Sequence, residues 1–153
     1  MSTIEDILSS EGTLVYKTRG VSMNPMLKQD RDLVIIQAPV SRLKKYDVAL
    51  YKRGENYVLH RVIEVGDDYY LIRGDNTFAL EKVMDSNVIG VLTEFKRKGK
   101  LHKTSDRGYV LYAKCWDKLY PVRAGVHRSV GFAKSLSRRI GFTAFVKEHL
   151  GKN

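Results

Sequence analysis

Short apolar runs separated by turn residues fill the middle of the chain, from Thr13 to Lys96. Several runs alternate apolar and polar positions, and others are apolar throughout, as strands of a partly buried sheet are. The expected strands are Leu14 to Thr18, Leu33 to Gln37, Val48 to Tyr51, Tyr57 to Glu64, Tyr69 to Arg73 and Val88 to Phe95. Turn residues at 53–56 and 66–68 are typical of hairpin connections. The pattern therefore predicts a compact, strongly bent antiparallel sheet or small barrel.

Helical periodicity replaces this pattern at the N-terminus. Ser2 and Glu5 have the spacing of a capping box, and the apolar positions that follow share one helical face. Gly12 can end the helix because it adopts a left-handed conformation without strain. The sequence predicts a short helix over residues 2–11.

A second helical region is expected after a basic linker at residues 96–100. Asp106 can cap a helix that ends at Pro121. Its apolar face would consist of Tyr109, Tyr112, Ala113, Trp116 and Leu119. A further helical stretch is expected from about 122 to 150. With the sheet, these helices give an α+β chain that is mainly β.

Length and charge divide the chain into two parts. The 153 residues suffice for one proper core, which we assign to a domain at residues 1–96. Residues 97–153 hold 14 Lys and Arg against 3 acidic residues, a charge of +11, while residues 1–96 hold 13 against 14, a charge of −1. We expect this amphipathic extension to contact an anionic partner, with a membrane surface favoured over nucleic acid. The alternative is an extra helical layer that packs on the sheet and keeps its Lys and Arg side chains in solvent.

Other features limit the location and the cofactors. The first residues lack the basic and apolar regions of a secretory signal, and no apolar stretch approaches the roughly 18 residues of a membrane span. We expect a cytoplasmic protein, peripheral at the inner face of the membrane. The single Cys115 cannot form an internal disulfide, and the scattered histidines give no metal-binding spacing. No Gly-rich phosphate loop occurs, and no cofactor is expected.

Three segments, at residues 20–27, 59–63 and 71–77, contain a serine, a histidine and an aspartate in that order. A serine becomes a good nucleophile when a base takes its proton, and the base works best when a third group orients it. Taken singly, each residue also has a structural explanation. Ser22 and Asp75 are typical of turns, and His60 is typical of a strand face in a core.

The ordered combination resembles the signal peptidase I family over roughly residues 12–95. The matching boxes are Ser22-Met23-Asn24-Pro25-Met26, Lys45-Tyr46-Asp47-Val48-Ala49-Leu50-Tyr51, His60-Arg61-Val62-Ile63, Gly74-Asp75-Asn76 and Asn87-Val88-Ile89-Gly90. The first resembles the family's Ser-Met-x-Pro nucleophile box, the third its base box and the fourth its Gly-Asp-Asn box. Histidine in place of lysine is similar to the archaeal and endoplasmic-reticulum branch. The self-cleaving repressor peptidases, which share the Ser-Met motif, use lysine.

The resemblance implies roles for these residues. Ser22 would be the nucleophile, His60 the base and later the acid to the leaving amine, and Asp75 the acidic partner. Site support would come from Gly20, Met23, Pro25 and Asn76, with Met23 packed below the site. Two residues before the nucleophile the family often has an oxyanion-binding serine, where this chain has Gly20, and Val21 replaces a usual glycine.

The eukaryotic-type motif also implies a further aspartate after Gly-Asp-Asn. Asp85 is the nearest candidate for it, and Glu81 is an alternative.

These features favour a serine endopeptidase that binds an extended, leader-like segment of a protein substrate as an added strand. The resemblance implies a preference for small side chains next to the cut. The alternative is a catalytically degenerate module that binds peptides, or a protein that binds an anionic membrane or nucleic acid through its basic tail.

Overall fold

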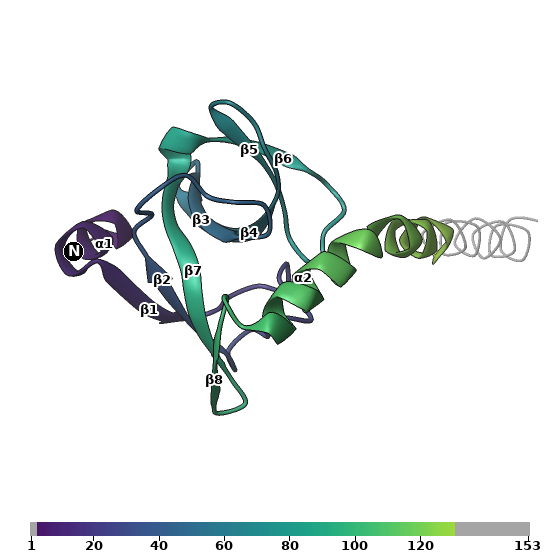
Figure 1. Ribbon diagram of the computed structural model, residues 1–153, viewed down its shortest axis with the longest axis horizontal. Helices are drawn as coiled ribbons and strands as arrows, with labels where there is room; N and C mark the ends of the chain where they lie inside the picture. The colour runs from purple at the N-terminus through teal and green to yellow at the C-terminus, as the bar shows by residue number, and fades with distance from the viewer. Residues whose placement is uncertain (1–2, 131–153) are drawn as a thin grey trace, which may run out of the picture. The chain divides into compact units, whose positions relative to one another are not determined.

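One antiparallel sheet dominates the computed structural model, which describes residues 3–130 (Figure 1). Within these residues the strands are β1 Thr13–Lys17, β2 Leu33–Gln37, β3 Val48–Arg53, β4 Asn56–Val65, β5 Tyr69–Arg73, β6 Glu81–Met84, β7 Val88–Arg97 and β8 Lys100–Lys103. The helices are α1 Ile4–Glu11, α2 Arg107–Lys118 and the short 3-10 helix η1 Asp85–Asn87. The expected mainly β, α+β class is confirmed.

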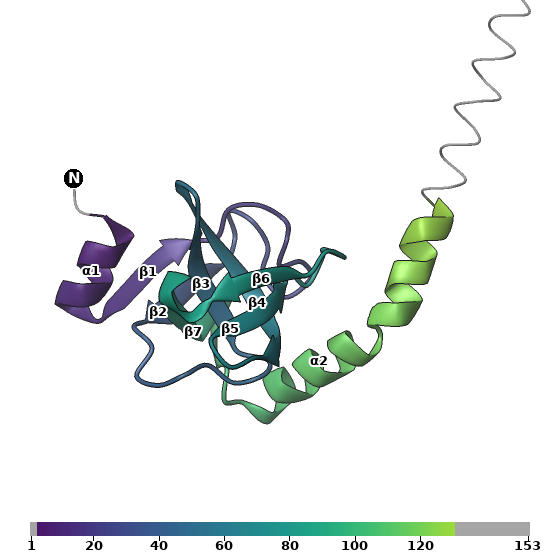
Figure 2. The same cartoon turned by 90° about the horizontal axis from the view of Figure 1, so that it is seen from above.

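The strands follow the order β1-β2-β7-β3-β4-β5-β6, and β8 pairs with β7. In the described part of the chain β1 and β6 do not pair with each other, so the sheet is not the closed small barrel that the sequence also allowed. Figures 1 and 2 show that the sheet curls on itself. Both expected hairpins, β3–β4 and β4–β5, are antiparallel pairs.

The N-cap of helix α1 lies one residue later than the sequence indicated. Thr3 is the N-cap: its hydroxyl accepts the Asp6 N–H at 3.2 Å, and the Asp6 carboxylate accepts the Thr3 N–H at 2.8 Å. The expected Ser2–Glu5 pair is therefore wrong. Glu5 instead accepts a hydrogen bond from the Tyr57 hydroxyl. This contact connects α1 to the β3–β4 hairpin. Gly12 ends the helix with φ 70°, as expected.

Two strands lack the apolar pattern that the sequence analysis used. In β6 only Val83 is buried, and β8 is mostly polar, so neither stands out from its surroundings. The expected basic linker at residues 96–100 is instead the end of β7 and a tight turn into β8. Lys98 and Gly99 both have positive φ, 49° and 82°, as tight hairpin turns require.

The chain divides into a compact unit that ends at Asp117 and a second unit from Lys118 onward. The first unit thus extends beyond the boundary expected at residue 96, because Tyr109 and Tyr112 of α2 form hydrogen bonds with Arg61 of β4 and with Asp75 of the β5–β6 loop. Helix α2 ends before Pro121, as expected. In the second unit residues 120–130 are helical, and the rest of the expected stretch to 150 lies outside the described residues. Among helices of the described chain, none has the length and apolarity to cross a membrane.

Candidate active site

Ser22 lies in the turn that follows β1, in a segment anchored by buried side chains. Met23 is 5% exposed, and Met26 and Leu27 are 2% and 1% exposed, all within one apolar cluster. The Leu27 N–H donates to the Met23 carbonyl at 2.9 Å, and the Asn24–Pro25 bond is cis. The buried side chains and the Leu27–Met23 hydrogen bond hold the turn that contains Ser22, which is itself half-buried.

A second loop, between β5 and β6, is bonded to the Ser22 segment. The Asn76 N–H donates to the Ser22 carbonyl at 2.7 Å, and Asn76 Nδ2 donates to the Val21 carbonyl at 3.3 Å. A Cβ at Gly74 would lie 2.7 Å from the Ser22 carbonyl oxygen and 3.0 Å from His60 Nε2. Only glycine therefore fits between the serine segment and the histidine ring.

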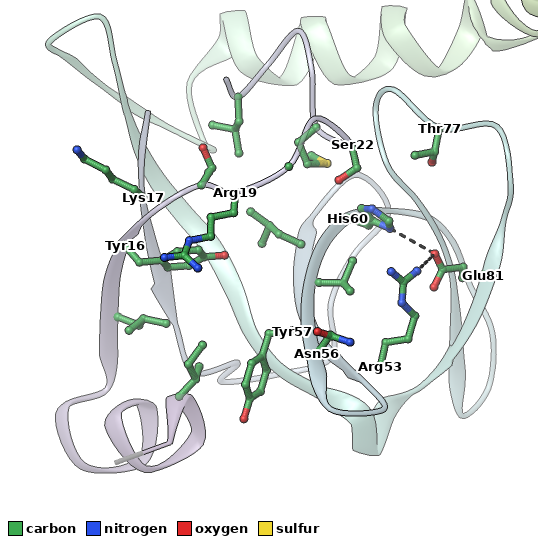
Figure 3. A pocket seen from close by; sticks show the side chains of 18 of the residues that line it. Tyr16, Lys17, Arg19, Ser22, Arg53, Asn56, Tyr57, His60, Thr77 and Glu81 are labelled. Atoms are coloured by element: carbon green, nitrogen blue, oxygen red, sulfur yellow. Dashed lines mark hydrogen bonds and ion pairs between the residues drawn. The ribbon is translucent and has the colours of Figure 1, made fainter. Parts of the chain in front are cut away.

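His60 lies on β4, paired with Ala49 of β3, and is 4% exposed. Figure 3 shows the Ser22 hydroxyl oxygen directed toward the His60 ring. In the described residues no hydrogen bond joins the two side chains. Catalytic hydrogen bonds are often loose before substrate binds. Burial lowers the pKa of His60, so the ring is neutral near pH 7 and able to accept a proton.

The other ring nitrogen of His60 faces a polar group that the sequence analysis did not identify as part of a site. Nδ1 lies 3.2 Å from the Tyr51 hydroxyl, which donates to Glu81 Oε2 at 2.8 Å. Glu81 Oε1 lies 3.7 Å from Nδ1 and accepts a hydrogen bond from Arg53 Nη1 at 2.9 Å. Figure 3 shows the contacts of Glu81 with His60 and Arg53.

Asp75 makes its closest contacts elsewhere. Its two carboxylate oxygens each accept a bond from Arg61, both at 2.8 Å, in a pair that is almost fully buried. The Tyr112 hydroxyl donates to the same carboxylate at 2.9 Å, and the Trp116 indole N–H donates to the Asp75 carbonyl at 2.8 Å. Burial disfavours the Arg61 charge, but the contact with Asp75 outweighs it and raises the pKa of the guanidinium. The expected bond from Asp75 to His60 is thus not among those formed by residues 3–130.

Asp85, the other expected acidic candidate, lies in η1 and pairs with Arg42 at 2.8 Å. It does not line the groove that holds Ser22 and His60. Of the two further acids that the sequence offered, Glu81 is the one beside the histidine.

The main-chain N–H groups of the serine turn are the candidate donors for an oxyanion. The Gly20 N–H is already donated to Gln29 Oε1 at 3.0 Å, so it does not supply one. The Ser22 N–H has no acceptor among the described residues, which leaves it available to a substrate oxygen. Val21, the residue before Ser22, is 57% exposed.

A groove of about 890 Å³ leads to Ser22 and His60. Residues 16–20 border it on one side and residues 56–60 on the other, as Figure 3 shows for the labelled members. Apolar side chains also line it, namely Ile4, Leu14, Met23, Leu27, Val58, Leu59 and Ala79. The groove therefore combines an apolar lining with a polar end at the serine.

Unpaired strand edges border this groove. The Thr18 N–H donates to the Asp32 carbonyl, and the Gly12 carbonyl accepts the Ala38 N–H. In an antiparallel pair every second residue directs its N–H and C=O toward the partner strand, so those of Val15 and Lys17 point away from β2. On β4 the Val62 N–H donates to the Asp47 carbonyl. By the same alternation, the main-chain N–H and C=O groups of Tyr57 and Leu59 point away from β3. Pairing of β4 with β5 starts only at Arg61. Both edges thus offer free main-chain donors and acceptors within the described chain.

Comparison with protein-family models and with curated proteins found no match for this chain.

Proposed function

We propose that the protein is a serine endopeptidase of the signal peptidase I type, in the branch that uses a Ser-His pair. The observation that carries the proposal is the convergence at Gly74, where the Ser22 segment and His60 Nε2 lie within 3.0 Å of one point. This convergence occurs at the end of a groove with two open strand edges. The order of the Ser22, His60 and Gly-Asp-Asn boxes along the chain supports the same assignment.

The chemistry follows from the positions of these groups. Ser22 Oγ attacks the scissile carbonyl carbon while His60 Nε2 takes the hydroxyl proton, and the Ser22 N–H stabilises the oxyanion that forms. His60 then gives the proton to the leaving amine, which leaves an acyl ester on Ser22. A water molecule, deprotonated by the same nitrogen, hydrolyses the ester and restores the serine hydroxyl.

The substrate is an extended segment bound as an added strand. Val15 and Lys17 on one side, and Tyr57 and Leu59 on the other, present the main-chain groups that such a strand needs. The apolar lining would hold alternate substrate side chains. The resemblance to signal peptidases suggests small side chains next to the scissile bond, as in a leader segment.

Turnover of peptides by matched serine variants tests the proposal. Wild type and Ser22→Ala are incubated with a library of extended peptides, and new termini are identified by mass spectrometry. Ser41→Ala is the control, because Ser41 is exposed and does not line the groove. We expect cleavage by wild type and Ser41→Ala and none by Ser22→Ala. Equal cleavage by all three contradicts the proposal, and peptide binding without cleavage by wild type favours a degenerate binding module.

A second candidate function is attachment to an anionic membrane surface, at the inner face of the membrane. Leu119, Val122, Val126 and Val130 recur at helical spacing and are 47–65% exposed, which is unusual for aliphatic side chains along one face. The chain from residue 97 onward carries a net charge of +11. Each basic residue near an anionic surface contributes about 1 kcal/mol.

Vesicle co-sedimentation tests this second function. Binding to vesicles that contain phosphatidylserine, but not to phosphatidylcholine alone, is expected for wild type. The double variant Val122→Asp/Val126→Asp should lose binding. Val40→Asp, a substitution of a fully exposed valine in the first unit, should keep it. Retention of binding by the double variant would refute the role of this helical face.

A further inference from the structure

We propose that Glu81, acting through the Tyr51 hydroxyl, is the acidic group that fixes the orientation and tautomer of His60, and that Asp75 does not have this role. Neither Tyr51 nor Glu81 would touch the reacting atoms, so both are positioning residues. The catalytic consequence rests on the proposed function, but the tautomer of His60 does not.

The hydrogen-bond chain allows one arrangement of protons. Tyr51 has a single hydroxyl proton, and an ionised carboxylate only accepts hydrogen bonds. Because Oε2 of Glu81 lies 2.8 Å from the Tyr51 oxygen, the proton lies between these two atoms. Burial, with the Glu81 contact, raises the pKa of Tyr51, which keeps the phenol protonated.

Because the Tyr51 hydroxyl donates its hydrogen bond to Glu81, the Tyr51 oxygen can only accept a hydrogen bond from His60. The 3.2 Å contact to Nδ1 is then an Nδ1–H···O bond, which places the neutral ring's proton on Nδ1. Nε2 keeps its lone pair on the side of Gly74 and Ser22. This tautomer is the one that a base for Ser22 requires.

Arg53 orients the carboxylate. It binds Oε1 at 2.9 Å and leaves Oε2 for Tyr51, so both carboxylate oxygens have a partner. When His60 becomes positively charged during the reaction, the Glu81 charge stabilises the imidazolium across the tyrosine. The charged groups that act on the ring are Glu81 of β6, Arg53 of β3 and Asp75 of the β5–β6 loop, and Glu81 has the largest effect of the three.

Asp75 is unavailable for this task because Arg61 neutralises it. The two side chains are 2% exposed each and form a bidentate pair. Tyr112 adds a third hydrogen bond to the carboxylate. Such a pair is geometrically fixed, and a turn of Asp75 toward His60 would leave the buried guanidinium without its counter-ion.

Two substitutions separate the relay from general damage. Tyr51→Phe removes the bridging oxygen and keeps the ring, and Glu81→Gln removes the charge. Tyr70→Phe is the control for the first, because Tyr70 is also buried and its hydroxyl accepts the Leu43 N–H. Glu94→Gln is the control for the second, because Glu94 and Glu81 are 29% and 28% exposed and each pairs with a basic side chain.

The first measurement is the His60 tautomer, read from histidine ¹⁵N chemical shifts by NMR at pH 7.5 in the full chain. We expect an Nδ1–H ring in wild type and in both control variants, and a gain of the Nε2–H form in Tyr51→Phe. Tyr112→Phe, which removes one hydrogen bond to the Asp75 carboxylate, should leave His60 in the Nδ1–H form. An Nε2–H ring in wild type, or a tautomer that responds to Tyr112→Phe and not to Tyr51→Phe, would overturn the proposal.

The second measurement is kcat/KM against pH on a cleaved peptide. Glu81→Gln should lower kcat/KM about 10²-fold, at the low end of the effect of a proton-transfer group. It should also shift the acidic limb to lower pH, because Glu81 raises the pKa of His60. An unshifted limb refutes the role of Glu81. Absence of any Ser22-dependent cleavage refutes the proposed function alone, since the NMR result still decides the tautomer.

Discussion

Substitution of Gly74 by alanine tests whether the site depends on the close approach of three segments. The added methyl group would lie 2.7 Å from the Ser22 carbonyl oxygen, a main-chain atom that also accepts the Asn76 N–H. It would also lie 3.0 Å from His60 Nε2. Real Cβ atoms essentially never come within 2.7 Å of another heavy atom, so the serine turn must shift, and the contact with His60 would be tighter than most Cβ contacts.

The expected magnitudes follow from this overlap. Overpacking by one methyl group in a well-packed region costs about 1–3 kcal/mol of unfolding free energy. Ser22 is displaced relative to His60 by a fraction of an ångström or more, and a misplacement of about 1 Å can lower a rate about 10²-fold. We therefore expect Gly74→Ala to lose more activity than its loss of stability explains.

The assay combines urea unfolding with peptide turnover at a temperature where the variant is folded. Gly108→Ala is the control: nothing lies within 4 Å of its Cβ position, and it is exposed in helix α2. This control should be neutral or about 0.5–1 kcal/mol more stable than wild type. Wild-type stability and turnover in Gly74→Ala would refute the reasoning.

Three further predictions concern the buried charges. Burial lowers the pKa of His60 below 6.5, so the unfolded chain takes up the proton first as the pH falls. The contribution of neutral His60 to stability is therefore complete above about pH 6.5 and is lost below it. Urea unfolding between pH 5 and 8 should show a fall in the free energy of unfolding toward low pH, and His60→Gln should flatten this pH dependence. Asp75→Asn leaves the Arg61 guanidinium buried without a counter-ion and should cost about 3–5 kcal/mol in chemical denaturation, and an unchanged midpoint would contradict a buried pair. Tyr112→Phe removes one hydrogen bond to the Asp75 carboxylate and should cost about 1.5–3 kcal/mol by the same measurement, whereas no loss would mean that α2 does not secure this loop.

Strand segments with a regular apolar pattern were predictable because burial of one face imposes it. Residues 33–37 and 69–73 match β2 and β5 to the residue. Strands β6 and β8 were not predictable, because they join the sheet through main-chain hydrogen bonds, which require no particular pattern of apolar side chains. The cap of α1 was misplaced by one residue, because Thr3 and Asp6 have the same chemistry as Ser2 and Glu5 and the sequence does not say which pair the first turn uses.

The candidate site divides in the same way. The sequence indicated Ser22, His60 and the Gly-Asp-Asn loop, and the structure brings Ser22, His60 and Gly74 together while pairing Asp75 with Arg61. Their catalytic roles remain predictions. Tyr51 gave no signal, because its closeness to His60 depends on strand register. Ala49 pairs with His60 and Tyr51 pairs with Val58, so Tyr51 is a diagonal neighbour of His60 on the same face.

The sequence by itself determined the main β segments, the N-terminal helix, the helix that follows Asp106, the basic composition after residue 96 and the residue types available for a serine and histidine pair. These depend on local periodicity and composition, which each segment shows alone. Only the tertiary structure decided which acid faces His60, because β6 brings Glu81 to Tyr51 while α2 and Arg61 hold Asp75. Partner choice among buried charges depends on register, sheet curvature and helix docking, and no single stretch of sequence contains these.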